Sequence, residues 1–326
     1  MRKRSILSVI ILGALAAALS AQSTLFYIEL QAVGAYSSAS AGIELFSLMP
    51  HDAMQKPSVG FDLVHRVSGR TRDIGVLAVQ ARLAYDHKGG GKLEPQLYNA
   101  YFRYKAGFAD LWAGHSRPAL GLSYGLDSHA LLLPAPAMMG FGFDRDWGLG
   151  LHRDLDWGDA AFSLTAGSGM PLYLKGNFLA AARISRGVTA RDNYSLGLSL
   201  AHGDILETMG YELMEPEPFR WTVASVDATY LWRNVENRVE VLFGQREGEA
   251  TALLFWRSGL SLFAEGRLKV ELQPVLTRTA GQWDYSLASG LTYLLSADLA
   301  GRFMVHYDHG RRDARFVVQL YYYKGL

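Results

Sequence analysis

The chain has 326 residues, a formal net charge of +1 at pH 7 and no cysteine. Without cysteine, the protein has no disulfides, no thiolate metal site and no cysteine nucleophile. The balanced charge excludes a whole-molecule field that would attract nucleic acid, so we expect no nucleic-acid partner.

The first residues predict a secretory signal peptide. Basic residues at 2–4 precede an apolar stretch over 6–19, and small residues follow at 20–21. This order of segments is typical of an export signal. The apolar stretch is shorter than the ~20 residues of a membrane-spanning helix, and no later segment offers an uninterrupted apolar run of that length. We therefore predict a signal peptide over 1–21 and a single mature domain over 22–326.

Polar and apolar residues alternate along much of the mature chain. Between 265 and 273, every odd position is polar, and leucine or valine fills each even position after the glycine. The same alternation over 98–105 places Tyr98 and Phe102 on an apolar face and Arg103 on a polar face. Successive side chains of a strand point to opposite faces, so this pattern predicts strands with one wet and one apolar face.

About sixteen such segments follow one another, each long enough to cross a bilayer as the ~9 to 11 tilted residues of a barrel strand. They predict an all-β fold, a transmembrane antiparallel β-barrel of about sixteen strands, with fourteen as the alternative count. The predicted strand centres are Tyr27, Leu63, Val79, Phe102, Leu111, Leu149, Leu164, Ala182, Leu198, Val226, Val241, Leu254, Val270, Leu287, Val305 and Leu320.

The links between the predicted strands alternate in length. Those after even-numbered strands are short, as at 68–70, and those after odd-numbered strands tend to be longer, as at 37–56 and 117–142. The links at 246–248 and 279–282 break this rule because they are short. Outer-membrane barrels have short periplasmic turns and long external loops. The alternation therefore predicts that both termini lie in the periplasm.

Two stretches resemble the phosphate-selective porin O and P family and its relatives among general outer-membrane porins. Residues 111–122 read LWAGHSRPALGL, similar to the strand that leads into the third external loop, and residues 293–303 read YLLSADLAGRF, similar to the closing hairpin. The resemblance implies a third loop, here 117–143, that folds into the lumen and narrows it, and a homotrimeric assembly. Family members that select phosphate carry a lysine-rich inner loop. This loop contains Arg117 but no lysine, which argues against phosphate selectivity.

The chain also stops on a predicted strand that ends in the apolar residue Leu326. Such an ending resembles the signal that the outer-membrane barrel-assembly machinery reads. We therefore expect that machinery and outer-membrane lipid among the partners.

A barrel of this strand number is too wide for its own side chains to fill, so we expect an aqueous channel. Strong ion selectivity needs rings of one charge sign. The polar faces carry both signs almost equally, which predicts weak selectivity. The predicted pore-lining residues are Arg66, Arg82, Arg103, Lys105, Asp146, Arg183, Arg238, Glu240, Arg267, Lys269, Glu271, Arg302 and Asp308.

The third loop provides the candidate constriction residues Arg117, Asp127 and His129. Its segment 131–141 reads LLLPAPAMMGF, which is too apolar for an external loop in water. We predict that this segment packs against the inner wall, because burial of apolar area is favourable. A hydrophobic slide for apolar or aromatic solutes is the alternative role.

The sequence favours a passive porin for small hydrophilic solutes or ions over an enzyme. His115 and Ser116 are adjacent on a strand and point to opposite faces, so they cannot form a catalytic pair. His306 and His309 also fall on opposite faces, so we expect no metal, no cofactor and no catalytic residue. The main alternative function is a structural barrel that sheaths a partner such as a multihaem cytochrome. A soluble β-sandwich or propeller is the alternative fold.

Overall fold

The computed structural model describes residues 24–48, 55–88, 90–126, 131–263 and 266–326. Its main feature is a set of sixteen long strands. These are β1 (Thr24–Ser37), β3 (Ser58–Ser68), β4 (Asp73–Asp86), β5 (Lys92–Lys105), β6 (Asp110–Ser116), β7 (Asp146–Leu155), β8 (Gly158–Thr165), β9 (Phe178–Arg186), β10 (Tyr194–Ile205), β13 (Phe219–Trp232), β14 (Val235–Arg246), β15 (Glu249–Leu262), β16 (Leu268–Thr279), β17 (Gln282–Leu294), β18 (Leu299–Asp308) and β19 (Asp313–Gly325).

Short elements occupy some of the connections. They are β2 (Gly42–Glu44), η1 (Leu122–Tyr124), η2 (Pro136–Met139), α2 (Thr189–Asp192), β11 (Thr208–Met209) and β12 (Glu212–Leu213). None of the helices in the described part of the chain has the length and apolar character that a transmembrane helix needs.

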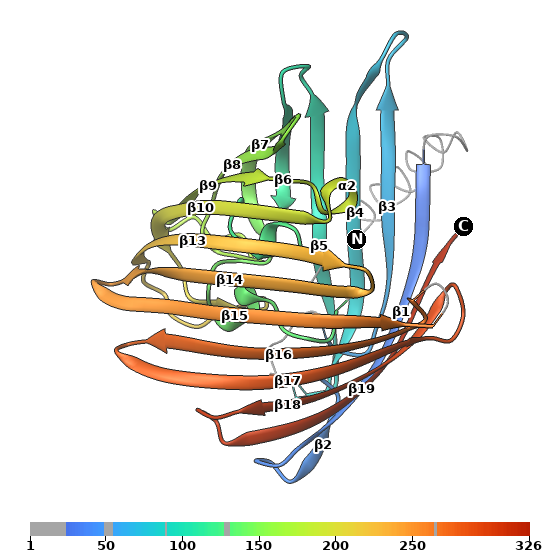
Figure 1. The fold of residues 1–326 in the computed structure, drawn as a ribbon, viewed down its shortest axis with the longest axis vertical. Coiled ribbons are helices and arrows are strands. Elements are labelled where there is room, and N and C mark those ends of the chain that lie inside the picture. Colours follow the sequence, from blue (N-terminus) through green and yellow to red (C-terminus); the bar gives the residue numbers. More distant parts are fainter. Residues whose placement is uncertain (1–23, 49–54, 89, 127–130, 264–265) are drawn as a thin grey trace, which may run out of the picture.

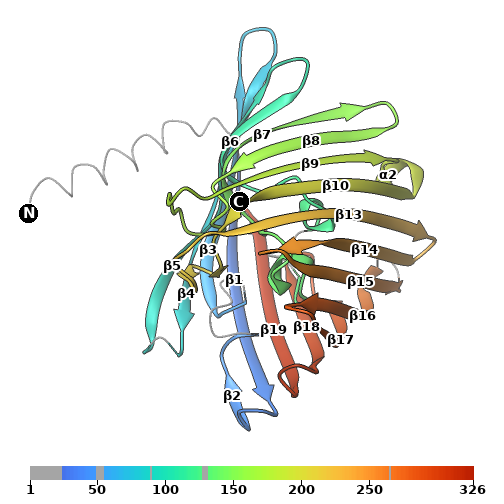
Figure 2. The same cartoon turned by 90° about the vertical axis from the view of Figure 1, so that its left-hand side faces the viewer.

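The sixteen long strands form a closed antiparallel barrel. Each strand pairs with its neighbours in chain order, and β1 pairs with both β3 and β19, from Tyr27 opposite Gly325 to Ser37 opposite Arg315. Strands on opposite sides of the barrel run at a steep angle to one another (Figures 1 and 2). The predicted sixteen-stranded barrel is confirmed, and every predicted strand centre lies within one of these strands.

The two faces of the barrel wall differ in chemistry. On β19, Phe316, Val318 and Leu320 are about half exposed, whereas Val317 and Gln319 between them are buried. The same alternation leaves large apolar side chains exposed on the outer face of most barrel strands. A soluble protein rarely exposes so large an apolar surface, so this outer band needs an apolar environment.

The two ends of the barrel differ in the length of their connections. At one end, the long-loop end, the connections include 38–57, 117–145, 166–177 and 206–218. At the other end, the short-turn end, each connection has at most seven residues, the longest being 187–193. Both terminal strands begin or finish at the short-turn end, as the alternation of link lengths predicts.

One strand departs from regular alternation. The pairing of β4 with β5 skips Tyr98, because Asn99 lies opposite Gln80 and Leu97 lies opposite Ala81. This bulge turns Tyr98 to the inner face, where it is buried and the Arg145 guanidinium lies 4.1 Å from its ring centre. The prediction that Tyr98 shares the apolar outer face was wrong, because an inserted residue shifts the alternation by one position.

Candidate functional site

The long connection 117–145 is here called the inner loop, and its described residues, 117–126 and 131–145, lie inside the barrel (Figures 1 and 2). Leu132 and Leu133 pack against inward side chains of β1 and β17–β19. Ala135 and Phe141 pack against inward side chains of β9, β10 and β13–β16. The apolar segment of the loop therefore covers the inner wall from β9 round to β1.

Arg257 on β15 fixes the inner loop to this wall. Its Nη2 donates hydrogen bonds to the backbone oxygens of Leu133 at 3.1 Å and Pro134 at 3.0 Å, and its Nε donates to Oε1 of Gln273 at 2.7 Å. Gln273 Nε2 donates to the Pro134 oxygen at 3.0 Å. These bonds satisfy carbonyl groups that would otherwise be buried without a partner, which is costly. Arg257 is not among the predicted pore-lining residues. The sequence could have identified it as an inward residue, because it directly follows the outward Trp256 in a strand whose outward positions also include Leu254.

Glu240 on β14 holds the first part of the inner loop. Its Oε2 accepts a hydrogen bond from the Leu122 backbone N–H at 3.1 Å, and its Oε1 accepts one from the Ser225 hydroxyl at 2.6 Å. Gly121 has φ +50°, and a β-carbon there would overlap the Glu240 carboxylate. Glu240 thus faces inward, as its strand phase predicts, but it lies buried beneath the loop and not against open space.

Asp146 is also buried and has a structural environment. Its carboxylate accepts hydrogen bonds from the backbone N–H groups of Gly167, Ser168 and Gly169 at 2.7 to 3.3 Å. Gly167 and Gly169 have φ values of +70° and +71°, which favour glycine. Asp146 therefore orders the turn that opens connection 166–177.

Charged side chains at the short-turn end are accessible to water. The side chains of Arg66 and Lys105 are 63% and 46% exposed, and both approach Asp73. Farther round the wall, Lys269 forms ion pairs with Glu236 at 3.2 Å and with Glu271 at 3.0 Å. Arg66 and Lys105 therefore remain accessible to water, and Lys269 and Glu236 are partly accessible.

Other predicted pore-lining residues lie within paired clusters of the wall. Arg82 and Glu29 form an ion pair at 3.1 Å, and their side chains are only 2% and 1% exposed. Arg183 pairs with Asp227 at 2.8 Å and approaches Asp159 at 3.5 Å. The Arg82 side chain is therefore hardly accessible to water. At Arg183, the two nearby carboxylates reduce the net charge that a passing ion would meet.

The remaining predicted residues differ in their surroundings. Arg238 bonds to the carboxylate of Glu236, and Arg302 donates to Gln319 at 2.8 Å. Arg103 lies 5.6 Å from the ring centre of Tyr101 on the same strand. Arg267 is exposed in the turn before β16, and Asp308 faces the cavity described below. The assignment of all these residues to a permeation path stays a prediction.

Of the three candidate constriction residues, only Arg117 lies within the described residues. Its Nη1 donates to the Tyr124 backbone oxygen at 3.4 Å. Burial, followed by the charge of Asp159, raises the pKa of Tyr124 to about 12, and Arg103, Arg183 and Arg117 lie close enough to lower it. Tyr124 is thus a position at which the charges of three arginines act. Asp127 and His129 lie outside the described residues.

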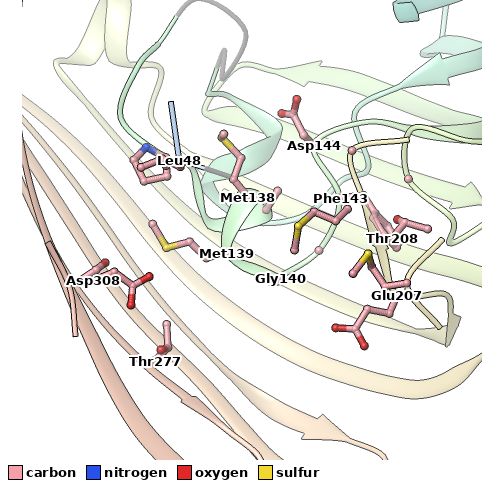
Figure 3. Close-up of a pocket in the computed structure, with 18 of the residues that line it drawn as sticks. Leu48, Met138, Met139, Gly140, Phe143, Asp144, Glu207, Thr208, Thr277 and Asp308 are labelled. Atoms are coloured by element: carbon pink, nitrogen blue, oxygen red, sulfur yellow. The ribbon is translucent and has the colours of Figure 1, made fainter. Parts of the chain in front are cut away.

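A cavity of about 420 Å³ opens at the long-loop end, above the inner loop. Met138, Met139 and Phe143 of the loop form one side, and Thr277 and Asp308 of the barrel wall form another (Figure 3). Its volume is in the range of small-molecule pockets.

The histidines do not form a metal cluster in the described part of the chain. His306 is buried on the inner face of β18, whereas His309 lies in the following turn and contacts Asp284 at 3.1 Å. His115 is buried and stacks against Trp147 on the neighbouring strand, with 4.9 Å between ring centres.

Searches of family models and of curated proteins give no match to this chain. Solved structures do match. OmpF of Salmonella typhi, in complex with daunomycin, is 11% identical with a TM-score of 0.69, covering 92% of this chain and 97% of its own. An anion-selective porin from Comamonas acidovorans is 12% identical, with a TM-score of 0.61 and coverage of 93% and 99%. The trimer form of OmpT, an outer membrane protein of Vibrio cholerae, is 11% identical, with a TM-score of 0.59 and coverage of 93% and 99%.

These likenesses define the fold as a general porin-like barrel. Because the identities are low, they concern the fold alone. The finer resemblance to the phosphate-selective porin O and P family stays a prediction.

Proposed function

We propose that the protein is a porin of the Gram-negative outer membrane that conducts small hydrophilic solutes or ions by passive diffusion. The observation that carries this proposal is the closed sixteen-stranded barrel, with an apolar outer band and with inward charged side chains that stay exposed at the short-turn end. The expected signal peptide supports export, and the start of β1 and the end of β19 at the short-turn end support a periplasmic location for both termini.

The permeation path runs, on this proposal, between the inner loop and the wall formed by β3–β8. The apolar segment of the inner loop covers the wall from β9 to β1, so we assign the solute path to the more polar wall opposite that segment. The charges of Arg103 on this wall, of Arg183 on the adjoining strand β9 and of Arg117 in the inner loop all act on Tyr124, together with that of Asp159. Arg183 is neutralised by Asp227, so we expect a weak preference for anions.

The packed inner loop also favours a porin over a barrel that sheaths another protein. Apolar side chains of the loop and the wall bury one another across ten barrel strands. A protein partner in the lumen would have to displace these contacts, which are favourable. We therefore keep the porin as the proposed function and expect no enzymatic activity.

A homotrimer is the assembly we propose. The apolar outer band offers surface for contacts between copies, and one structurally similar protein, OmpT of Vibrio cholerae, has a trimer form. Chemical cross-linking of the protein in outer membranes would test this assembly, and a purely monomeric ladder would contradict it.

The central experiment is single-channel recording of the refolded protein in a planar bilayer, with the reversal potential measured in a salt gradient. We expect discrete open steps and a small reversal potential whose sign indicates that anions permeate more readily than cations. A heat-modifiable, correctly folded barrel that gives no conductance would overturn the porin proposal.

A further inference from the structure

The cavity at the long-loop end has an unusual apolar lining. Five of the six methionines in the described part of the chain line it, and the sixth packs beneath the inner loop. Methionine is flexible and polarisable, so it suits surfaces that adapt to different apolar shapes. The five methionines are Met138, Met139, Met170, Met209 and Met214.

These methionines come from three separate connections at the long-loop end. Met138 and Met139 belong to the inner loop, Met170 to connection 166–177, and the other two to 206–218. All five are at least partly exposed, in contrast to the fully buried Met304. Phe143 and Phe219 extend the same apolar surface. Partly exposed apolar side chains that converge on one cavity are a favourable surface for an apolar ligand group.

The rest of the lining carries charges of both signs. Arg246 pairs with Glu207 at 2.6 Å on one side of the cavity, and Arg315 pairs with Asp313 at 2.7 Å on the other. The acidic lining residues are Asp144, Glu207, Asp284, Asp308 and Asp313, and the arginines are Arg145, Arg246, Arg311 and Arg315. The cavity therefore has little net charge, and a solute with one charge sign gains no net attraction from it.

We infer that this cavity binds a small zwitterionic solute with an apolar or aromatic body. The methionines cover the apolar body, and the paired acidic and arginine side chains receive the two charged ends. Figure 3 shows Met139 on the inner loop facing the wall that carries Thr277 and Asp308, so one ligand can contact both surfaces. The role of this site in uptake rests on the proposed porin function, but binding itself does not.

The test uses L-tryptophan as the probe, with the refolded full chain in detergent and binding followed by saturation-transfer NMR titration. Glycine lacks the apolar body, tryptamine lacks the carboxylate, and indole-3-propionate lacks the ammonium group. We expect tryptophan to bind at least about tenfold more tightly than each of the three, since a tenfold ratio corresponds to about 1.4 kcal/mol of selective contact. Equal binding of glycine, or equal binding of all three indoles, would overturn the inference.

Two disruptive variants and one conservative control assign the binding to this cavity. Met138→Ser combined with Met139→Ser should weaken tryptophan binding about tenfold, because it removes the apolar surface of the inner loop. Met139→Leu keeps volume and apolar character, so it should retain binding. Asp308→Asn should weaken tryptophan and tryptamine but leave indole-3-propionate unchanged. If the double-serine variant and Asp308→Asn both bind tryptophan as the original chain does, the site is elsewhere and the inference fails.

Conductance of the same preparations separates this inference from the porin proposal. A chain that conducts ions but binds tryptophan no better than glycine would overturn only the binding site. A chain that binds tryptophan selectively but gives no conductance would overturn only the porin.

Discussion

The inner wall of the barrel has two regions of different character. From β9 to β16, inward side chains such as Leu242, Leu253 and Phe255 are apolar and buried beneath the inner loop. On β3–β5, the inward side chains include Gln80, Arg82 and Asn99, which bond to one another or to other polar groups of the wall and its connections. The strands of both regions therefore have the same apolar outer face but differ in the chemistry of their inner face. The comparison shows that inward positions beneath the loop are mostly apolar, and that polar side chains such as Glu240 and Arg257 bond there to the loop backbone.

The largest expected effect comes from removing the arginine that holds the loop to the apolar region. Arg257→Leu removes two hydrogen bonds from a charged donor to the loop, each worth about 1.5 to 3 kcal/mol. We expect a lower midpoint of thermal unfolding and a larger or noisier single-channel conductance, because the loop leaves the wall.

Arg238→Leu is the matched control, since that arginine bonds to the wall carboxylate of Glu236. Equal conductance in the Arg257→Leu variant and the original chain would contradict the anchoring role of Arg257.

The next largest effect concerns the start of the inner loop. Gly121→Ala forces a side chain into the Glu240 carboxylate and into a positive φ that costs about 1 to 3 kcal/mol. Gly140→Ala is the control, because φ there is +85° and a β-carbon would meet nothing within 4 Å. We expect only the Gly121 variant to change conductance as well as stability, and equal conductance changes in both would show that backbone strain alone is responsible.

A smaller effect is expected on the polar side of the path. Arg103→Gln removes one cation near Tyr124, so the anion-to-cation permeability ratio should fall about twofold. This change corresponds to about 0.4 kcal/mol, in the range of solvent-exposed charge interactions. The reversal potential in a salt gradient measures it, with Lys105→Gln at the exposed rim as the comparison. A larger shift from Lys105→Gln would place the selective region at the rim instead.

The smallest effect concerns acidification of the loop 38–57. Burial acts to raise the pKa of Glu44. The hydrogen bond from Lys88 and the positive charges of Arg315 and Lys88 have the larger opposite effect, so the pKa of Glu44 lies below its usual value of 4.5. A lowered folded-state pKa stabilises the fold above pH 4.5, and this contribution is lost as the pH falls through the folded-state value.

Limited proteolysis of this loop should therefore become faster at pH 3 than at pH 6. Glu44→Gln should remove most of the difference, because the amide does not titrate in this range. An unchanged pH dependence in that variant would assign the effect to other carboxyl groups.

The sequence by itself determined the strands, their number as about sixteen with fourteen left open, and their two faces, except where the bulge at Tyr98 shifts the alternation. Alternation such as that of Phe316, Val318 and Leu320 depends only on neighbouring residues, because side chains of a strand point to opposite faces. The apolar composition of 131–141 also determined that this segment needs a covered environment, and the structure shows the described loop residues against the wall.

Only the tertiary structure decided which inward residues remain accessible. Glu240 and Lys269 both lie on the inner faces of their strands, yet Glu240 is buried under the loop whereas Lys269 stays partly exposed at the short-turn end. The loop that makes this difference is distant from both in sequence. The cavity lined by five methionines is likewise formed by three connections, and no local sequence pattern predicts that these connections lie close together. Strand periodicity is a local property, whereas coverage of the inner wall and the cavity arise from contacts between distant segments.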